Sequence, residues 1–111
     1  MTEVVELESL RLSRRASRFE GRDHGSSISF FLVEYRRGDA VGLHRHPYDE
    51  TFVVQAGEGV FSVDGEEIPA SAGQVVVVPA GAAHGFRCAG GDVLRVLSVH
   101  PSDHVVQEDL E

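Results

Sequence analysis

The 111-residue sequence has no tryptophan, one methionine and a single cysteine, Cys88. One cysteine cannot form an internal disulfide, so the fold does not depend on an oxidising compartment, and we expect a cytoplasmic location. No apolar run approaches the roughly 20 residues that a membrane-spanning helix needs. The N-terminus also lacks the basic and apolar segments of a signal peptide. We therefore expect neither secretion nor insertion into a membrane.

Basic residues are also scarce, because ten Lys and Arg stand against 18 Asp and Glu and give a formal net charge of -8. This charge repels phosphate backbones and anionic lipid surfaces at long range. Five arginines do cluster near the N-terminus, without interleaved aromatic residues and with glutamates beside them: Arg11, Arg14, Arg15, Arg18 and Arg22. We interpret this cluster as a solvated strand surface, with an anion site as the alternative. Nucleic acid and membrane are not expected partners.

Long amphipathic helices are missing as well, and short β-branched and aromatic runs take their place. Residues 28–35 and 51–54 have this composition, which favours strands. The continuous run Val75–Val78 predicts a buried strand. The pair Asp64 and Gly65 between two apolar runs predicts a type I′ hairpin turn, because both central residues of that turn need positive φ.

The remaining turns and the C-terminus complete the predicted architecture. Glycines at 57–59 and 90–91 indicate two further reversals, and residues 93–99 indicate a last strand. Residues 102–110 predict a short C-terminal tail or helix. Nearly ten short strands predict an all-β sandwich or barrel. Because no linker or repeat divides the chain, we expect residues 1–111 to form one domain.

Three histidines and one glutamate have a spacing that core packing does not explain: His44, His46, Glu50 and His84. His44 and His46 are two residues apart, so both imidazoles point to one face of an extended strand. Glu50 opens the next strand and can fold back beside them, and His84 follows a turn that lets a later strand re-enter. Neutral imidazoles and a carboxylate suit one divalent transition metal per chain, Fe, Mn, Ni, Cu or Zn. Four ligands leave two positions open in an octahedral ion, unlike a closed structural zinc site.

These residues complete two motifs that resemble those of the cupin family. The first, G-x5-H-x-H-x3-E-x6-G, is matched over residues 38–57, and the second, G-x5-P-x-G-x2-H-x3-N, over residues 73–88. One position departs, because Cys88 stands where the family usually has Asn, which is not one of its usual metal ligands. The resemblance implies a double-stranded β-helix, that is a jelly-roll barrel, with the three histidines and the glutamate converging inside it. It also implies a homodimer, for which residues 4–12 are a candidate pairing segment.

Five further side chains are candidates for the wall of the pocket: Phe52, Phe61, Phe86, Cys88 and His100. Phe52 and Phe86 share the strand parity of the ligands. Cys88 should face inward, either as a small buried side chain or as a redox-sensitive thiol near the metal. By its parity His100 can approach the barrel mouth, although a solvated position is more usual for a histidine near a terminus.

Three functions agree with these features. The first, which the cupin resemblance supports, is a metal-dependent dioxygenase in which a small organic enolate or catecholate and O₂ use the two open positions. Glu50 would bind the metal and, once loosened, act as a base. The second is a non-redox isomerase, epimerase, cyclase or lyase that uses the same metal. The third is a non-catalytic module that binds a small ligand.

Overall fold

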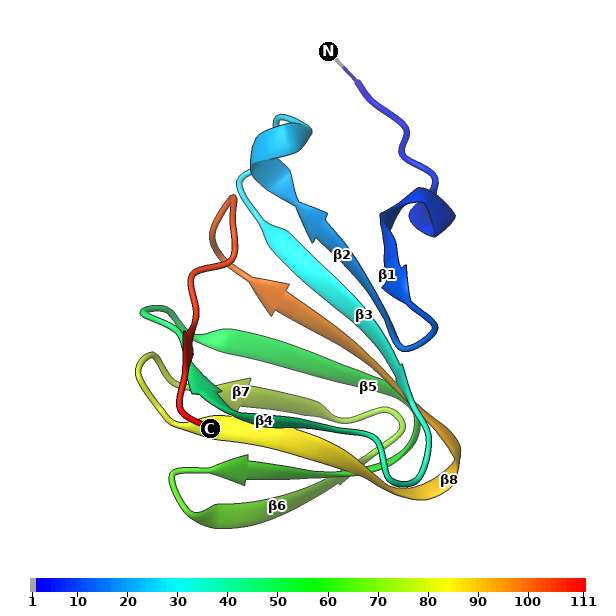
Figure 1. Cartoon of the computed structure of the whole chain (residues 1–111), viewed down its shortest axis with the longest axis vertical. Coiled ribbons are helices and arrows are strands. Elements are labelled where there is room, and N and C mark those ends of the chain that lie inside the picture. The colour runs from blue at the N-terminus through cyan, green and yellow to red at the C-terminus, as the bar shows by residue number, and fades with distance from the viewer. Residues whose placement is uncertain (1) are drawn as a thin grey trace.

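The computed structural model describes residues 2–111, which form one curled sheet of nine strands (Figure 1). In chain order the strands are β1 (Arg11–Ser13), β2 (Ala16–Glu20), β3 (Ser29–Tyr35), β4 (Ala40–Arg45), β5 (Glu50–Val63), β6 (Glu66–Ser71), β7 (Val75–Val78), β8 (His84–His100) and β9 (Glu108–Asp109). Helical structure in the described residues is limited to two 3₁₀ turns, η1 (Leu7–Leu10) and η2 (Gly21–Asp23). None of these turns could cross a membrane as a helix. The all-β prediction is confirmed.

The long strands β5 and β8 are the frame of the barrel. They pair with each other along most of their length. The other edge of β8 pairs with β4 near its start and with β3 near its end. The other edge of β5 pairs with β7 near its start and with β6 near its end. All these pairings are antiparallel, and the bend of the two long strands folds the sheet back on itself (Figure 1).

The bend in β5 and β8 requires glycine. Gly57 has a φ of 78°, and a Cβ there would lie 2.2 Å from the carbonyl oxygen of Val93. Gly91, with a φ of 77°, faces it from β8, and its own Cβ would lie 3.2 Å from the Gly57 Cα. Register shifts between Val54 and Gly59 mark the same place. The predicted reversals at these glycines are therefore wrong, because both strands bend here and continue.

The structure confirms the prediction for the hairpin turn and contradicts part of the prediction for the valine run. Asp64 and Gly65 have φ of 47° and 86°, so the predicted turn with two positive φ values is confirmed between β5 and β6. The valine run forms β7 with the predicted bounds, but Val75 and Val77 are 59% and 61% exposed, whereas Val78 is 1% exposed. The prediction of a buried strand is therefore wrong for Val75 and Val77, because β7 pairs only with β5 and covers the core with one face.

The C-terminal segment is an extended tail and not a helix. It runs along the open side of the barrel, where β9 pairs with β4 at His44 and Arg45 (Figure 1). The backbone N–H of Leu110 donates to the Leu43 carbonyl at 2.9 Å. The free edge of β4 offers partners for the backbone of the tail, and strand pairing satisfies these groups in place of helical hydrogen bonds.

The apolar core lies between the layers, on the inner faces of β5 and β8. The rings of Phe52, Phe61 and Phe86 pack on one another with centroid distances of 5.0 to 5.5 Å. Leu94 and Val96 are completely buried beside them. Each such side chain stabilises the fold by about 1.5–3 kcal/mol relative to an exposed one. The polar residues considered next are buried at the edge of this cluster.

Candidate metal centre

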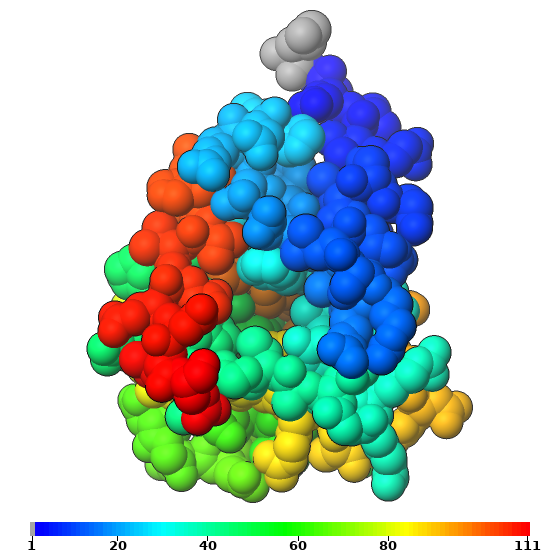
Figure 2. Space-filling view, viewed as in Figure 1, coloured from blue at the N-terminus to red at the C-terminus, as the bar shows by residue number. Residues whose placement is uncertain are grey.

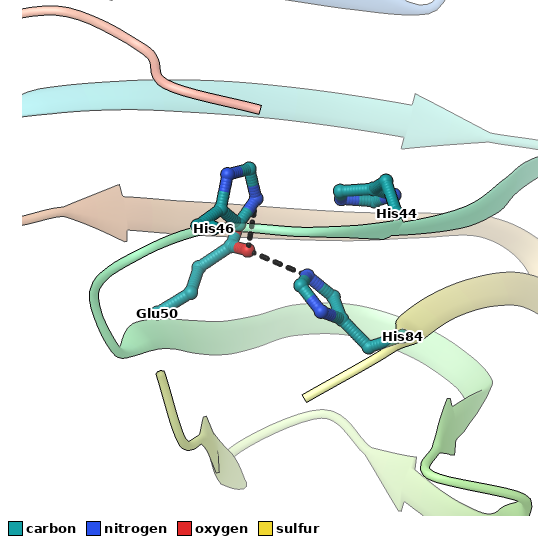
Figure 3. A group of neighbouring side chains, drawn as sticks. All are labelled: His44, His46, Glu50 and His84. Carbon is teal, nitrogen blue, oxygen red and sulfur yellow. Dashed lines mark hydrogen bonds and ion pairs between the residues drawn. The ribbon is translucent and has the colours of Figure 1, made fainter. Parts of the chain in front are cut away.

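Four buried side chains converge between the layers of the barrel: His44, His46, Glu50 and His84 (Figure 3). One potential ligand atom from each lies within 4.8 Å of those of the others. The structure thus brings together the whole set that the sequence indicated as metal ligands.

Three strands, β4, β5 and β8, position these side chains. His44 on β4 is paired directly with His84, the first residue of β8. Glu50 is the first residue of β5, across a short connection from the end of β4. The turn at Asp64 holds the segment before His84, since its N–H donates to the Ala83 carbonyl at 2.8 Å and its carboxylate accepts the Ala83 N–H at 2.9 Å. Glu50 pairs with Val78 on β7, and the His46 carbonyl accepts the Gly81 N–H at 2.8 Å, so backbone contacts hold all four positions.

Backbone carbonyls also orient the three imidazoles. In each ring, Nδ1 lies 2.8 or 2.9 Å from a carbonyl oxygen; the pairs are His44 with Gly42, His46 with Val106, and His84 with Ala82. Because a carbonyl oxygen only accepts, each Nδ1 carries a proton, and each neutral ring keeps the lone pair of Nε2. This is the usual arrangement of a metal-binding histidine, whose second nitrogen is held by an outer partner.

Two of these Nε2 atoms lie beside a carboxylate oxygen. Oε1 of Glu50 lies 3.1 Å from Nε2 of His46 and 2.9 Å from Nε2 of His84. The 3.1 Å contact brings two acceptors together when His46 is neutral, and Nε2 of His46 has no hydrogen-bond partner. A buried polar atom without a partner costs about 1–3 kcal/mol. A divalent cation bonded to these atoms would remove that cost, so the donor set fits a metal ion.

The charges of the site agree with metal binding. Burial raises the pKa of Glu50, but the neighbouring imidazoles, His100 first and then His46 and His84, outweigh it and hold the pKa of the carboxyl well below its usual range. Burial lowers the pKa of His84, but the Glu50 carboxylate and the hydrogen bond to the Ala82 carbonyl outweigh this effect, and the pKa is raised. Burial lowers the pKa of His44. A metal ion would compete with a proton for Nε2 of His84 and would balance the Glu50 carboxylate.

A cavity of about 200 Å³ is lined by three of the four side chains, His44, His46 and Glu50. It opens in the hollow between the N-terminal strands and the C-terminal tail (Figure 2). Its walls are mainly apolar and include Phe31, Val33, Tyr35, Val41, Phe52 and Phe86. Its polar lining consists of ligand candidates together with Ser98, His100 and Gln107. Neither Lys nor Arg lies among the described residues that line it.

The predicted pocket residues fall into two groups. Phe52, Phe86 and His100 line the cavity. Phe61 and Cys88 do not: Phe61 stacks on Phe86 at a centroid distance of 5.1 Å, and the Cys88 thiol donates to the Gly90 carbonyl. These two assignments are corrected to core positions. His100 is 1% exposed and not solvated, because β8 extends to this residue and the chain connection around Tyr48 covers it.

Sequence reasoning missed Tyr48 and Val106. Tyr48 lies in the connection between β4 and β5, where its hydroxyl is 2.6 Å from Nδ1 of His100 and its ring stacks on His46 at 5.2 Å. The i, i+2 spacing from His46 is a signal that would have indicated this face. Val106 acts through its backbone carbonyl, so its side chain carries no such signal.

The N-terminal arginines are part of the surface. Arg11 pairs with Glu8 at 3.1 Å, and Arg15 pairs with Asp39 at 3.0 Å. None of the five arginines is among the residues that line the cavity. This placement agrees with the interpretation of a solvated strand surface.

Comparison with known proteins places these features in a family. A family model described as "Cupin domain" matches residues 31–100. An oxalate-binding protein of Thermotoga maritima is 32% identical over 77 residues, which cover 68% of this chain and 64% of that protein. The polyketide synthase CurC of Streptomyces cyaneus is 36% identical over 75 residues, which cover 66% of this chain and 49% of that protein. The chain thus spans less than two thirds of the length of either relative.

Solved structures of oxalate decarboxylase from Bacillus subtilis have the same fold. One superposes with a TM-score of 0.82 at 23% identity, over 94% of this chain and 30% of that one. Another, from a study of its Mn(II) centres, has a TM-score of 0.77 at 24% identity, over 88% of this chain and 29% of that one. At this identity the likeness shows the fold, and the predicted jelly-roll barrel is confirmed.

Proposed function

This chain belongs to the cupin family, and from that premise we propose that it is a metal-dependent dioxygenase of a small organic substrate. The observation that carries the proposal is the convergence of one potential ligand atom from each of three histidines and Glu50 beside a cavity for a small molecule. His44, His46, Glu50 and His84 would hold one divalent Fe, Mn, Ni, Cu or Zn ion. The ion would supply two further positions and would polarise the groups bound there.

The charges around the cavity favour a singly charged substrate. A divalent ion with one carboxylate ligand has a net charge of +1, and no Lys or Arg is among the described residues of the lining. An enolate or a phenolate balances this charge. A dianion would leave uncompensated negative charge in a region of low dielectric. The apolar walls at Phe31, Val33 and Phe86 favour a hydrophobic body, so we propose enolisable diketones or phenols as the substrate class.

Glu50 is both a proposed metal ligand and the candidate base for the substrate proton. Its lowered pKa makes the bound carboxylate a weak base, so a base role requires the carboxylate to leave its present partners. Replacing Glu50 with Gln separates the two roles. Loss of metal indicates a ligand, whereas loss of turnover with the metal retained indicates a base.

Metal analysis and oxygen consumption test the proposal. Elemental analysis of protein purified without added metal identifies the ion. The Fe, Mn, Ni and Cu forms are then tested in an oxygen electrode with diketones, thiols and phenols. We expect one O₂ per substrate, because both oxygen atoms enter the product and no further reductant is needed. If no metal form consumes oxygen with any of these substrates, the dioxygenase proposal is wrong.

A non-catalytic binding module is the second candidate, because a 32% identical relative is named an oxalate-binding protein. Calorimetric titration of the Mn(II) form with oxalate and with a diketone distinguishes the two. Tight oxalate binding without turnover favours the binding module. Tighter binding of the diketone supports the charge argument. Product formation by a Zn(II) form without oxygen would instead indicate a non-redox isomerase, epimerase, cyclase or lyase.

We also propose that the protein forms a homodimer through its N-terminal segment. β1 is an edge strand, and Val4, Leu7 and Leu12 expose apolar surface around it. A second copy that pairs with this edge would cover these side chains. Sedimentation equilibrium should give twice the chain mass of 12.1 kDa, and Leu12→Lys should shift the protein towards the monomer.

A further inference from the structure

His100 contacts Glu50 on the oxygen that faces away from the other histidines. Nε2 of His100 lies 3.0 Å from Oε2 of Glu50, whereas His46 and His84 approach Oε1. His100 is buried, but it does not belong to the group of four converging ligand atoms. The two oxygens of one carboxylate therefore have different surroundings. Oε1 faces the metal position, and Oε2 faces His100.

Tyr48 holds the other nitrogen of this ring. The Tyr48 hydroxyl lies 2.6 Å from Nδ1 of His100, and the backbone N–H of Val106 donates to the Tyr48 oxygen at 3.3 Å. The hydroxyl proton is thus free to be donated to Nδ1. Nε2 then carries the ring proton and donates it to Oε2 of Glu50. With the His100 ring neutral, every donor in the series Val106, Tyr48, His100 and Glu50 faces an acceptor.

Packing keeps the His100 ring in this orientation. Its centroid lies 4.7 Å from that of His46, edge to face, and 5.5 Å from that of Phe31. Ser98 Oγ lies 3.4 Å from Nε2 on the same strand. The ring is packed against two aromatic neighbours and has polar partners at both nitrogens, and Oε2 of Glu50 is closer to Nε2 than Ser98 Oγ is, so we infer that the donor is directed to Oε2.

We propose that His100, oriented by Tyr48, is a positioning residue that makes Glu50 a one-oxygen metal ligand. The inference rests on the proposed function only in requiring a metal at the four converging side chains. Carboxylates bind metal ions through one oxygen or through both. A carboxylate whose Oε2 is free can rotate and bind with both oxygens, which fills a position that the substrate needs. The hydrogen bond from His100 prevents this rotation and keeps that position open.

Co(II)-loaded full-length protein tests the role without any substrate. The visible absorption of Co(II) reports its coordination number and geometry, and chelator competition gives its affinity. His100→Leu removes the donor at similar volume. We expect a changed Co(II) spectrum and an affinity that is lower by about 10- to 100-fold. In His100→Gln the side-chain amide can donate to Oε2, so both properties should return towards those of the wild type.

Two further variants complete the experiment. Tyr48→Phe keeps the ring that stacks on His46 and removes only the hydroxyl, so a smaller spectral change in the same direction is expected. His104→Gln is the matched control, because His104 is partly exposed and bonds to Asp103. It should leave the spectrum and the affinity unchanged.

The spectrum decides the outcome. A His100→Leu spectrum identical to that of the wild type overturns the positioning role even if affinity falls, because a purely structural residue would also lower affinity. X-ray absorption data with four imidazole ligands overturn it as well, since His100 would then bind the metal. If His100→Leu does not fold, as judged by circular dichroism, Tyr48→Phe decides by the same criterion. A wild type that binds no Co(II) overturns the metal centre itself and this inference with it. The expected spectra without oxygen consumption overturn only the dioxygenase proposal.

Discussion

Two histidines of the metal centre are oriented by their own strand segments, whereas the other two ligands depend on the far end of the chain. The local half consists of His44 and His84. Each donates its Nδ1 proton to a carbonyl two residues earlier, that of Gly42 or Ala82. These contacts form whenever β4 and the start of β8 form, so the local half is a direct product of the barrel.

The remote half consists of His46 and Glu50. The Nδ1 proton of His46 goes to the Val106 carbonyl, which lies 60 residues later in the sequence. Glu50 is held at Oε2 by His100, and the Val106 N–H also donates to the Tyr48 hydroxyl that orients His100. One residue of the tail thus supports both ligands of this half. The comparison teaches that the barrel alone does not complete the centre, and that docking of the tail is required as well.

Loss of a metal ligand should lower metal affinity more than any other change. The loss should be equal for ligands of the two halves. His44→Ala and His46→Ala each remove one of four donors. Structural zinc sites bind with about 10–16 kcal/mol, so one donor is worth roughly 10²- to 10³-fold in affinity. Chelator competition with Co(II) or Zn(II) measures this loss. A much smaller loss for His46→Ala would show that the remote half is not part of the centre.

The identity of the ligands in both halves could be predicted from the sequence because motif spacing is local information. The i, i+2 spacing fixed the face that His44 and His46 share, and the motif ending at Gly57 agreed with a bend that only glycine allows. The identity of all four converging side chains therefore followed from spacing. The valine run was less informative, because whether Val75 and Val77 are covered depends on a neighbouring strand that the run itself does not encode.

The support of the remote half could not be predicted in the same way. Val106 contributes only backbone atoms, which any residue except proline has in full. The tail has no helical or strand periodicity of its own, and its pairing as β9 depends on the free edge of β4. His100 had the correct parity, but parity alone did not distinguish a solvated ring from one held by Tyr48 and Glu50. These features depend on tertiary contacts between distant residues.

Acidification should weaken metal binding about 100-fold between about pH 7.5 and 5.5, because protons compete for the imidazole lone pairs. The pKa shifts of the two histidines in the local half have opposite directions. The raised pKa of His84 makes its proton compete at higher pH, whereas the lowered pKa of His44 delays competition. Isothermal titration over this pH range measures the effect. Affinity that is constant down to pH 5 would contradict ligation by three histidines.

The same shifts predict the stability of the metal-free protein. The raised pKa of His84 contributes stability that is fully present below about pH 6.5 and is lost as the pH rises through the folded-state pKa. The lowered pKa of Glu50 contributes stability that is present above about pH 4.3 and is lost at lower pH. The lowered pKa of His44 changes stability with pH in the opposite direction, so it partly offsets the contribution of His84. The gap between the melting temperatures of metal-bound and metal-free protein should therefore close as the pH falls towards 5.

Removing the tail should disturb the ligands of the remote half and leave those of the local half in place. A chain that ends at residue 104 loses the Val106 contacts to His46 and Tyr48 together with the β9 pairing. Because these contacts orient ligands without binding the metal, we expect an affinity that is lower by about 10- to 50-fold. Circular dichroism should still show the barrel, since β9 is a two-residue edge strand. A chain that ends at residue 109 is the control and keeps Val106. Unchanged affinity in the shorter chain would mean that the remote half does not need the tail.

The smallest loss of metal affinity should follow from breaking the surface ion pair that joins the tail to β4. Arg45 and Glu108 lie 3.0 Å apart, and their side chains are 44% and 62% exposed. Water and salt screen such a pair, so Arg45→Gln should lower metal affinity by less than about threefold at physiological salt. Glu108→Gln should match it, and the double variant should show no further loss. A tenfold loss that disappears in high salt would show that charge, and not the backbone pairing of β9 with the His44 and Arg45 segment, holds the tail against the remote half.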